Sequence, residues 1–266
     1  MTAQVSTEHL SAIMQSARRR TLELLDGLTD VQLVGPRLPI VNPLIWEIGH
    51  VAWFYEFFIL RQEFGHRPLL DRGDLLYDSI AIAHNTRWDL PVYPLTEMKD
   101  YMARVLDTLL DNLNHGLAGE RDSYLYQFTT FHEDMHNEAY TYSRQTLGYP
   151  APDFALTETE TASGGALPGD ANIPGGTLEI GKQQDAPFVF DNEKWAYQVI
   201  VAPFKMSKAQ VSNAEFAAFV DDGGYREERF WDEVGWQWRC QAGWYGWRVV
   251  ATIEQQGLRP LKTNGS

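Results

Sequence analysis

The stretch from residue 124 to residue 145 constrains the fold most, because it contains neither glycine nor proline and carries two histidines four positions apart. An uninterrupted stretch of this kind is typical of a helix. Residues four apart lie on one helix face, so His132 and His136 point the same way. Two imidazoles so placed bind one transition-metal ion, and we expect a third ligand from elsewhere in the chain.

Three further helical segments are predicted before this one, over residues 6–27, 43–64 and 96–117. The first and third carry an apolar stripe at helical spacing, whereas the middle one is apolar on most sides and is expected to be central. Its start is predicted from a capping Asn42 followed by Pro43. Together the four segments predict an antiparallel bundle, a fold that often builds metal sites from facing helices.

His50, inside the central segment, is the natural third ligand beside His132 and His136. Glu47 precedes it by about one turn and is expected to orient its ring. The alternative for His50 is a buried histidine that is hydrogen-bonded to a neighbour. Arginines 18 to 20 of the first helix are expected to form a solvated face.

The connection over residues 65–94 is long for a compact domain, and such loops are often functional. We assign Arg87 and Asp78 as candidate substrate-binding residues, since a guanidinium group matches a carboxylate with two parallel hydrogen bonds. The alternative for Arg87 is a structural ion pair with Asp78 or Asp89.

The second half of the chain has a different pattern. Residues 151–173 are rich in Thr, Ser, Gly, Glu and Ala and are predicted to form a linker. Short strand-like runs follow, with a short helix that begins at Ser212. We therefore expect an α+β protein, with a metal-binding four-helix bundle over 1–150, a linker over 151–173 and a mixed domain over 174–266.

The net charge of −14 argues against a nucleic-acid partner or an anionic membrane surface. The single cysteine, Cys240, forms no internal disulfide, which suits a reducing compartment. The sequence shows no signal peptide and no apolar run of the roughly 20 residues that cross a bilayer. A cytoplasmic protein without a membrane partner is expected.

Two sets of residues resemble a known family, the iron(II)-dependent sulfoxide and selenoxide synthases of the EgtB, OvoA and SenA type. The first set is the HxxxHxE pattern from His132 to Glu138, preceded by His50. The second set comprises Gly175-Gly176, Phe188 to Glu193, Val211 to Phe216, Gly223-Gly224-Tyr225, Phe230-Trp231 and Gly235 to Arg239. The resemblance extends to about Arg239 and implies a DinB-like bundle followed by a partial formylglycine-generating-enzyme-like domain.

The resemblance implies that His50, His132 and His136 hold Fe(II), the expected cofactor. Three ligands on one side of the ion leave room for O2 and a donor. It also implies O2-dependent C–Se or C–S bond formation on the imidazole of hercynine or histidine, with a thiol or a selenosugar as donor. Such a step belongs to selenoneine or ergothioneine synthesis.

Two departures from the family pattern bear on specificity and activity. Enzymes of this type that use gamma-glutamylcysteine carry several arginines in the loop after the second helix, whereas this loop offers Arg87 between residues 77 and 91. We therefore favour a selenosugar donor and the SenA branch. The family's catalytic tyrosine is expected beyond the end of this sequence, and metal binding is expected to survive such shortening better than catalysis.

Two alternatives from other classes remain open. His132-Glu133-Asp134-Met135-His136 also fits H-E-x-x-H, the zinc metalloprotease signature in which the glutamate is the general base. A protease would draw its third ligand from a downstream carboxylate such as Glu158 or Glu160. The other alternative is an inactive binding protein that retains a vestigial site.

Overall fold

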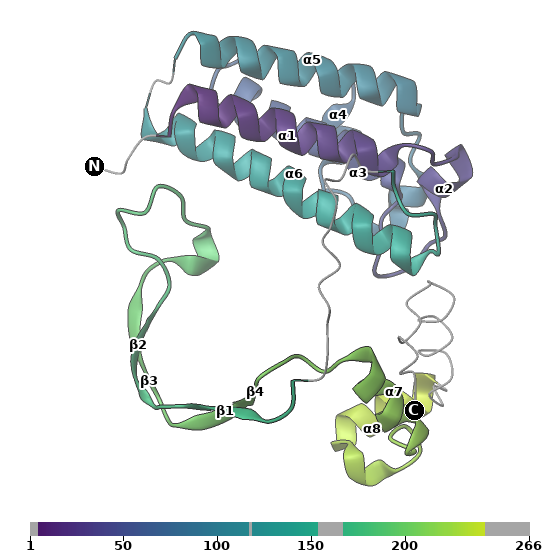
Figure 1. Cartoon of the computed structure of the whole chain (residues 1–266). Coiled ribbons are helices and arrows are strands. Elements are labelled where there is room, and N and C mark those ends of the chain that lie inside the picture. Colours follow the sequence, from purple (N-terminus) through teal and green to yellow (C-terminus); the bar gives the residue numbers. More distant parts are fainter. Residues whose placement is uncertain (1–4, 117–118, 154–166, 243–266) are drawn as a thin grey trace. The chain divides into compact units, whose positions relative to one another are not determined.

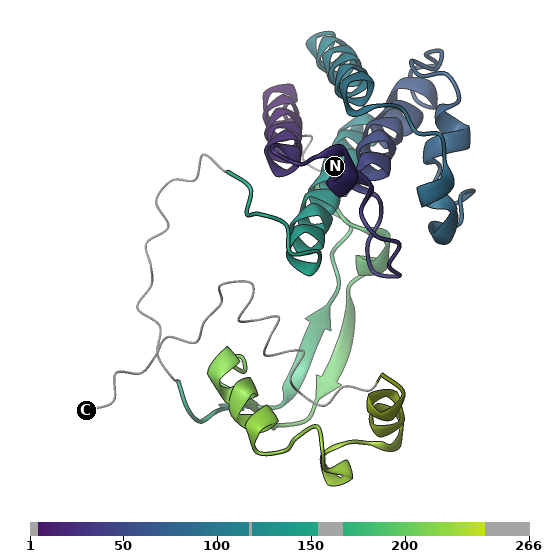
Figure 2. The same ribbon diagram turned by 90° about the vertical axis from the view of Figure 1, so that its right-hand side faces the viewer.

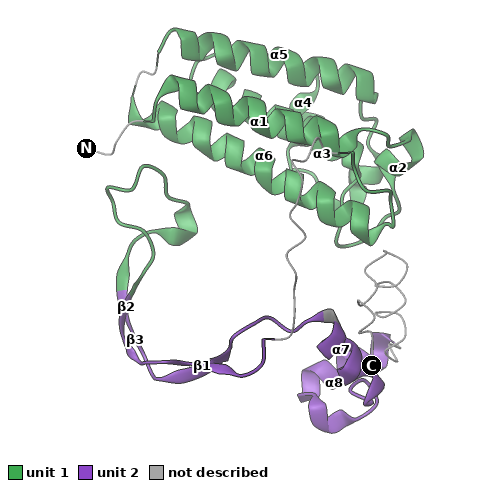
Figure 3. Cartoon of the chain, viewed as in Figure 1, with its two compact units in different colours: residues 1–157, 179–197 green, residues 158–178, 198–266 purple. Residues whose placement is uncertain are grey.

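The computed structural model of the chain describes residues 5–116, 119–153 and 167–242. They form two compact units, one of residues 1–157 with 179–197 and the other of residues 158–178 with 198–266 (Figure 3). The first unit is helical, and the second contains strands and short helices. This confirms the α+β class.

Four long segments form the bundle of the first unit (Figure 1). They are α1 (Thr7–Leu25), α3 (Leu44–Tyr55) with a π-helical continuation (Glu56–Arg61), α5 (Leu95–Asn114) and α6 (Glu120–Thr146). Shorter helices connect them: α2 (Asp30–Val34), α4 (Gly73–Tyr77) and a 3₁₀ turn (His84–Asp89). α1 packs on α5 and α6, and α3 packs on the same two helices.

The ends of the first and second long helices show how local chemistry sets the bounds. The Ser6 hydroxyl accepts the backbone N–H of His9 at 3.2 Å and caps α1 as a serine at this position should. The expected cap at Asn42 is wrong, because Pro43 is the residue before α3 and makes no side-chain cap. The Asn42 side chain is engaged with Glu47 instead.

The core of the bundle is apolar and continuous, and α3 lies at its centre as expected. Every residue of α3 except Phe54 is buried, including its polar members Glu47 and His50. Gly49 is required for close packing here, because a Cβ at this position would lie 2.1 Å from Cε1 of Tyr77. Thus the ring of Tyr77 packs directly on the backbone next to His50.

The strands form two-stranded ribbons (Figure 2). β1 (Asp170–Ile173) pairs antiparallel with β4 (Phe204–Ser207), so that Asp170 faces Ser207. β2 (Gly176–Ile180) pairs with β3 (Tyr197–Val201). β1 occupies the last residues of the expected linker, while residues 154–166 of that linker lie outside the described residues. The predicted domain boundaries stay a prediction.

The second unit also contains α7 (Asn213–Asp221), a 3₁₀ turn (Glu228–Phe230) and α8 (Glu233–Ala242). Ser212 caps α7 through Glu215 N at 3.2 Å, as the sequence predicts. Tyr225 is the centre of a small aromatic group and contacts Trp231 at 5.1 Å and Phe219 at 6.0 Å. Cys240 is free and exposed.

The segment between β2 and β3 belongs to the unit of the bundle. Phe188 stacks on Tyr124 of α6 with ring centres 5.1 Å apart, and it meets Phe131 edge-on at 4.9 Å. The Lys194 ammonium group lies 5.6 Å from the Tyr124 ring centre. α6 therefore receives an aromatic cover from a part of the chain beyond the expected linker.

Among the described helices, none combines the length and the apolar character that a membrane span requires.

Candidate metal centre

The three histidines singled out from the sequence meet inside the bundle. His50 comes from α3, and His132 and His136 come from α6. One ring nitrogen of each lies within 4.8 Å of the others. The ring centres are 5.0, 5.1 and 4.6 Å apart, and the rings stand edge to face. Two nitrogens bound to one ion at about 2.1 Å are at most about 4.2 Å apart, so small side-chain rotations suffice.

A backbone carbonyl fixes the tautomer of His50. Nδ1 of His50 lies 2.8 Å from the Tyr77 carbonyl oxygen. A carbonyl only accepts hydrogen bonds, so Nδ1 carries the proton and Nε2 keeps a free lone pair. Burial, assisted by the nearby His136, lowers the pKa of His50 to about 3. The ring is therefore neutral at pH 7, the state that a metal ligand requires.

The other two rings carry unsatisfied buried nitrogens. Nδ1 of His132 and Nδ1 of His136 are buried and make no hydrogen bond in the described part of the chain. Burial also lowers the pKa of His132 well below its ordinary value. A buried polar atom without a partner costs about 1–3 kcal/mol, and the cost is expected to be offset by function. Three converging imidazoles fit a divalent first-row ion such as Fe(II).

Aromatic side chains hold two of the rings in place. Trp46 stacks on His50 at 4.9 Å, and Phe54 stacks on His132 at 3.6 Å. Sequence reasoning assigned both only to the core. Their positions, one turn before and one turn after His50, were the signal that could have linked them to the site.

The sequence expectation for Glu47 was wrong in its partner. The Oε2 atom of Glu47 lies 3.7 Å from Nδ1 of His136, whereas His50 is held by Tyr77. The Oε1 atom of Glu47 accepts a hydrogen bond of 2.7 Å from Asn42 Nδ2. Glu47 lies on α3, so α3 contributes one imidazole and one carboxylate to the same group.

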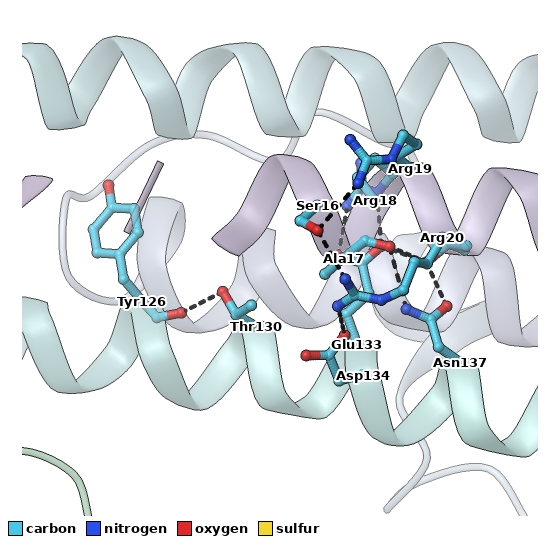
Figure 4. Close-up of polar contacts among 11 residues, drawn as sticks. Ser16, Ala17, Arg18, Arg19, Arg20, Tyr126, Thr130, Glu133, Asp134 and Asn137 are labelled. Atoms are coloured by element: carbon cyan, nitrogen blue, oxygen red, sulfur yellow. Dashed lines mark hydrogen bonds and ion pairs between the residues drawn. The ribbon is translucent and has the colours of Figure 1, made fainter. Parts of the chain in front are cut away.

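Figure 4 shows that Glu133, the residue after His132, is in polar contact with Arg18 of α1. Glu133 accepts hydrogen bonds at 2.8 Å from Arg18 Nε and from the Thr21 hydroxyl, both on α1. A metalloprotease needs this carboxylate at the metal as general base, so the geometry contradicts that alternative. Its candidate downstream ligands, Glu158 and Glu160, lie outside the described residues.

Arg87 is tied into the wall beside His50. Its guanidinium carbon lies 3.9 Å from the centre of the Trp46 ring. Nη1 of Arg87 donates to Asn42 Oδ1 at 2.8 Å, and its Nε is buried without a hydrogen bond to any described residue. Asp89 instead pairs with Arg37, with Arg37 Nη2 2.5 Å from Asp89 Oδ1.

Asp78 supports the backbone of the loop. Its Oδ1 accepts the backbone N–H groups of Ile80 at 2.9 Å and Ala81 at 3.3 Å. The residue before it, Tyr77, supplies the carbonyl that holds His50. The structure thus places Asp78 and Arg87 in the loop next to the imidazole group, and their roles toward a substrate stay predictions.

Comparison with known protein families gives two matches. Residues 13–139 match the DinB superfamily, and residues 155–261 match the sulfatase-modifying factor enzyme 1-like domain. These matches confirm the expected order of a DinB-like bundle and a formylglycine-generating-enzyme-like domain. The second match reaches residue 261, so the expectation that the resemblance stops at about Arg239 was wrong.

Curated relatives of the chain are named hercynine oxygenases. The protein of Mycolicibacterium thermoresistibile is 34% identical over 238 residues, which cover 85% of this chain and 51% of the relative. The Mycobacterium tuberculosis protein is 32% identical over 242 residues, covering 90% of this chain and 56% of the relative. The chain therefore spans about half the length of the curated relatives that it matches.

Proposed function

Given that the chain belongs to the sulfoxide synthase family of these hercynine oxygenases, we propose that it acts as an iron(II) oxygenase on hercynine or a related histidine derivative. In this proposal His50, His132 and His136 hold the iron. The observation that supports it most is the convergence of three buried imidazoles, with Nε2 of His50 left free by the Tyr77 carbonyl.

The proposed reaction joins the ring carbon of the acceptor to the sulfur or selenium of a donor. The acceptor loses its C–H hydrogen and the donor its S–H or Se–H hydrogen, and a C–S or C–Se bond forms. One oxygen atom of O2 enters the sulfoxide or selenoxide, and the other leaves as water, so four electrons pass to O2. Iron(II), when bound, supplies the activation of O2 that this chemistry needs.

The residues of the chain have three tasks in this proposal. The three imidazoles bind on one side and leave the other positions open for small molecules. Trp46 and Phe54 fix two of the rings and exclude water from their faces. Arg87 places a positive charge beside Trp46, where it would attract the carboxylate of a donor or acceptor.

The donor is left to experiment, and a selenosugar remains our choice because the loop offers Arg87 alone between residues 77 and 91. The test incubates the full chain with Fe(II), O2 and hercynine, with cysteine, gamma-glutamylcysteine and a selenosugar in parallel. Mass spectrometry of the products identifies the donor through the C–S or C–Se bond formed. Metal binding without any product would overturn the catalytic proposal and favour the inactive binding protein.

A further inference from the structure

Glu47 is the one acidic side chain of α3, and it is buried on the face that carries the imidazole group. Its Oε2 is buried and makes no hydrogen bond in the described part of the chain. The Nδ1 atom of His136, 3.7 Å away, is also buried and makes no hydrogen bond to a described residue. A carboxylate oxygen only accepts and an imidazole N–H only donates, so the two atoms are complementary partners at slightly more than hydrogen-bond distance.

We propose that Glu47 is a positioning residue that holds the Nδ1–H of His136 and so presents Nε2 of that ring to the metal. The inference rests on the proposed function only in requiring a divalent metal at the three imidazoles. Histidine ligands commonly donate their second ring N–H to a carboxylate or a carbonyl. Here Glu47 does for His136 what the Tyr77 carbonyl does for His50.

The carboxylate is itself fixed from the other side. Asn42 Nδ2 donates to Glu47 Oε1 at 2.7 Å, and Arg87 Nη1 donates to Asn42 Oδ1 at 2.8 Å. The Asn42 amide thus joins Glu47 to Arg87 through its two ends. A substrate carboxylate that binds Arg87 would perturb this series of polar contacts, which ends at the ring of His136.

The local charges support the same role. Glu47 is 1% exposed, and an isolated buried carboxylate is costly. The positive charge of Arg87 interacts with Glu47, and Asn42 joins the two side chains by hydrogen bonds. A divalent ion held by the rings would place further positive charge near the carboxylate, so the metal and Glu47 should stabilise each other.

The test measures metal affinity, because a residue that orients a metal-binding histidine affects how tightly the metal is bound. Co(II) and Zn(II) binding to the full chain is measured by competition with a chromophoric chelator, for the wild type and for Glu47→Gln. The neutral amide is a weaker acceptor and cannot replace the carboxylate charge. The expected result is a loss of about 10–100-fold in affinity, the usual effect of removing such a partner.

The matched control is Glu56→Gln. Glu56 is also 1% exposed and directly follows α3, but it is engaged with the Tyr101 hydroxyl and the backbone N–H of Leu69. Glu56→Gln should leave metal affinity within about twofold of the wild type, because the partners of Glu56 are Tyr101 and Leu69 and sites without shared partners act independently. Equal losses in both variants would mean a general effect of buried carboxylates and would overturn the proposal.

A second measurement covers the case in which Glu47→Gln does not fold. In the Zn(II)-loaded wild-type chain with ¹⁵N-labelled histidines, the Nδ1–H of His136 should be observed by NMR and be slow to exchange with water. A deprotonated Nδ1 would overturn the proposal. A wild-type chain that binds no divalent ion contradicts the proposed function, whereas undiminished binding by Glu47→Gln contradicts this inference alone.

Discussion

Arg18 of α1 and Glu133 of α6 form a buried ion pair, with Arg18 Nε 2.8 Å from Glu133 Oε1. Arg18 also donates to the Met102 carbonyl oxygen at 2.6 Å, so one side chain links three helices. The expectation of a solvated face for arginines 18 to 20 was therefore wrong for Arg18. The ion pair ties the carboxylate of Glu133 to α1, so Glu133 is a structural residue.

Replacing Glu133 should cost stability without weakening metal binding. Glu133→Ala leaves the Arg18 charge buried and unpaired, which lowers the free energy of unfolding by about 3–5 kcal/mol. Chemical denaturation measures this change, and chelator competition at low denaturant measures metal affinity. Arg20→Ala is the control, because Arg20 pairs with Asp134 at the surface and its loss should cost no more than about 1 kcal/mol. A folded Glu133→Ala that no longer binds metal would contradict the structural role of Glu133.

Each metal histidine should be necessary. His50→Ala, His132→Ala and His136→Ala remove one of three converging nitrogens and should each lose most of the bound iron. Elemental analysis after anaerobic loading gives the iron content per chain. His115→Ala is the control, because His115 is exposed at the end of α5 and its ring nitrogen contacts the Asp111 carbonyl oxygen of that helix. Full iron content in any one of the three variants removes that residue from the site.

Arg87→Ala should weaken the binding of a carboxylate-bearing substrate more than it weakens the binding of metal. The loss of one charged hydrogen-bonding partner is expected to raise KM roughly tenfold, or about 1.4 kcal/mol, with a smaller change in iron content. Arg87→Lys keeps the charge but not the planar group that lies over Trp46. Steady-state kinetics and iron analysis are measured together. If neither changes in Arg87→Ala, the residue is structural.

Gly49→Ala tests the packing that holds His50. The added methyl group would meet the Tyr77 ring at 2.1 Å and push α4 away from α3. Overpacking of this kind costs about 1–3 kcal/mol, and metal affinity should fall as well because the Tyr77 carbonyl fixes His50. Thermal denaturation and chelator competition give the two quantities. Gly176→Ala adds the same group where nothing lies within 4 Å and should change neither.

The helices and the meeting of the histidines were predictable because both follow from periodicity. Spacing of four residues places His132 and His136 on one face, and an apolar helix with His50 must lie in the core. Local capping chemistry was equally readable at Ser212. These inferences use neighbours within a turn or the simple contrast between core and water.

Contacts between distant segments could not be predicted. Nothing near Arg18 in the sequence indicates Glu133 as its partner. The run of three arginines also does not indicate which of them is buried. Glu47 likewise lies one turn from His50 but turns toward a ring on another helix. β2 is exposed along its whole length, so it has no alternation of buried and exposed residues from which its pairing partner could be predicted.

The aromatic cover on α6 matters for anyone who divides this protein into fragments. Tyr124 and Phe131 meet Phe188, which follows them by more than fifty positions in the printed sequence. An expression fragment that ends at residue 150 contains the last bundle helix but lacks Phe188. The rings of Tyr124 and Phe131 would then be exposed to water, which favours aggregation. Mutational tolerance at position 188 is therefore tied to a helix of the bundle.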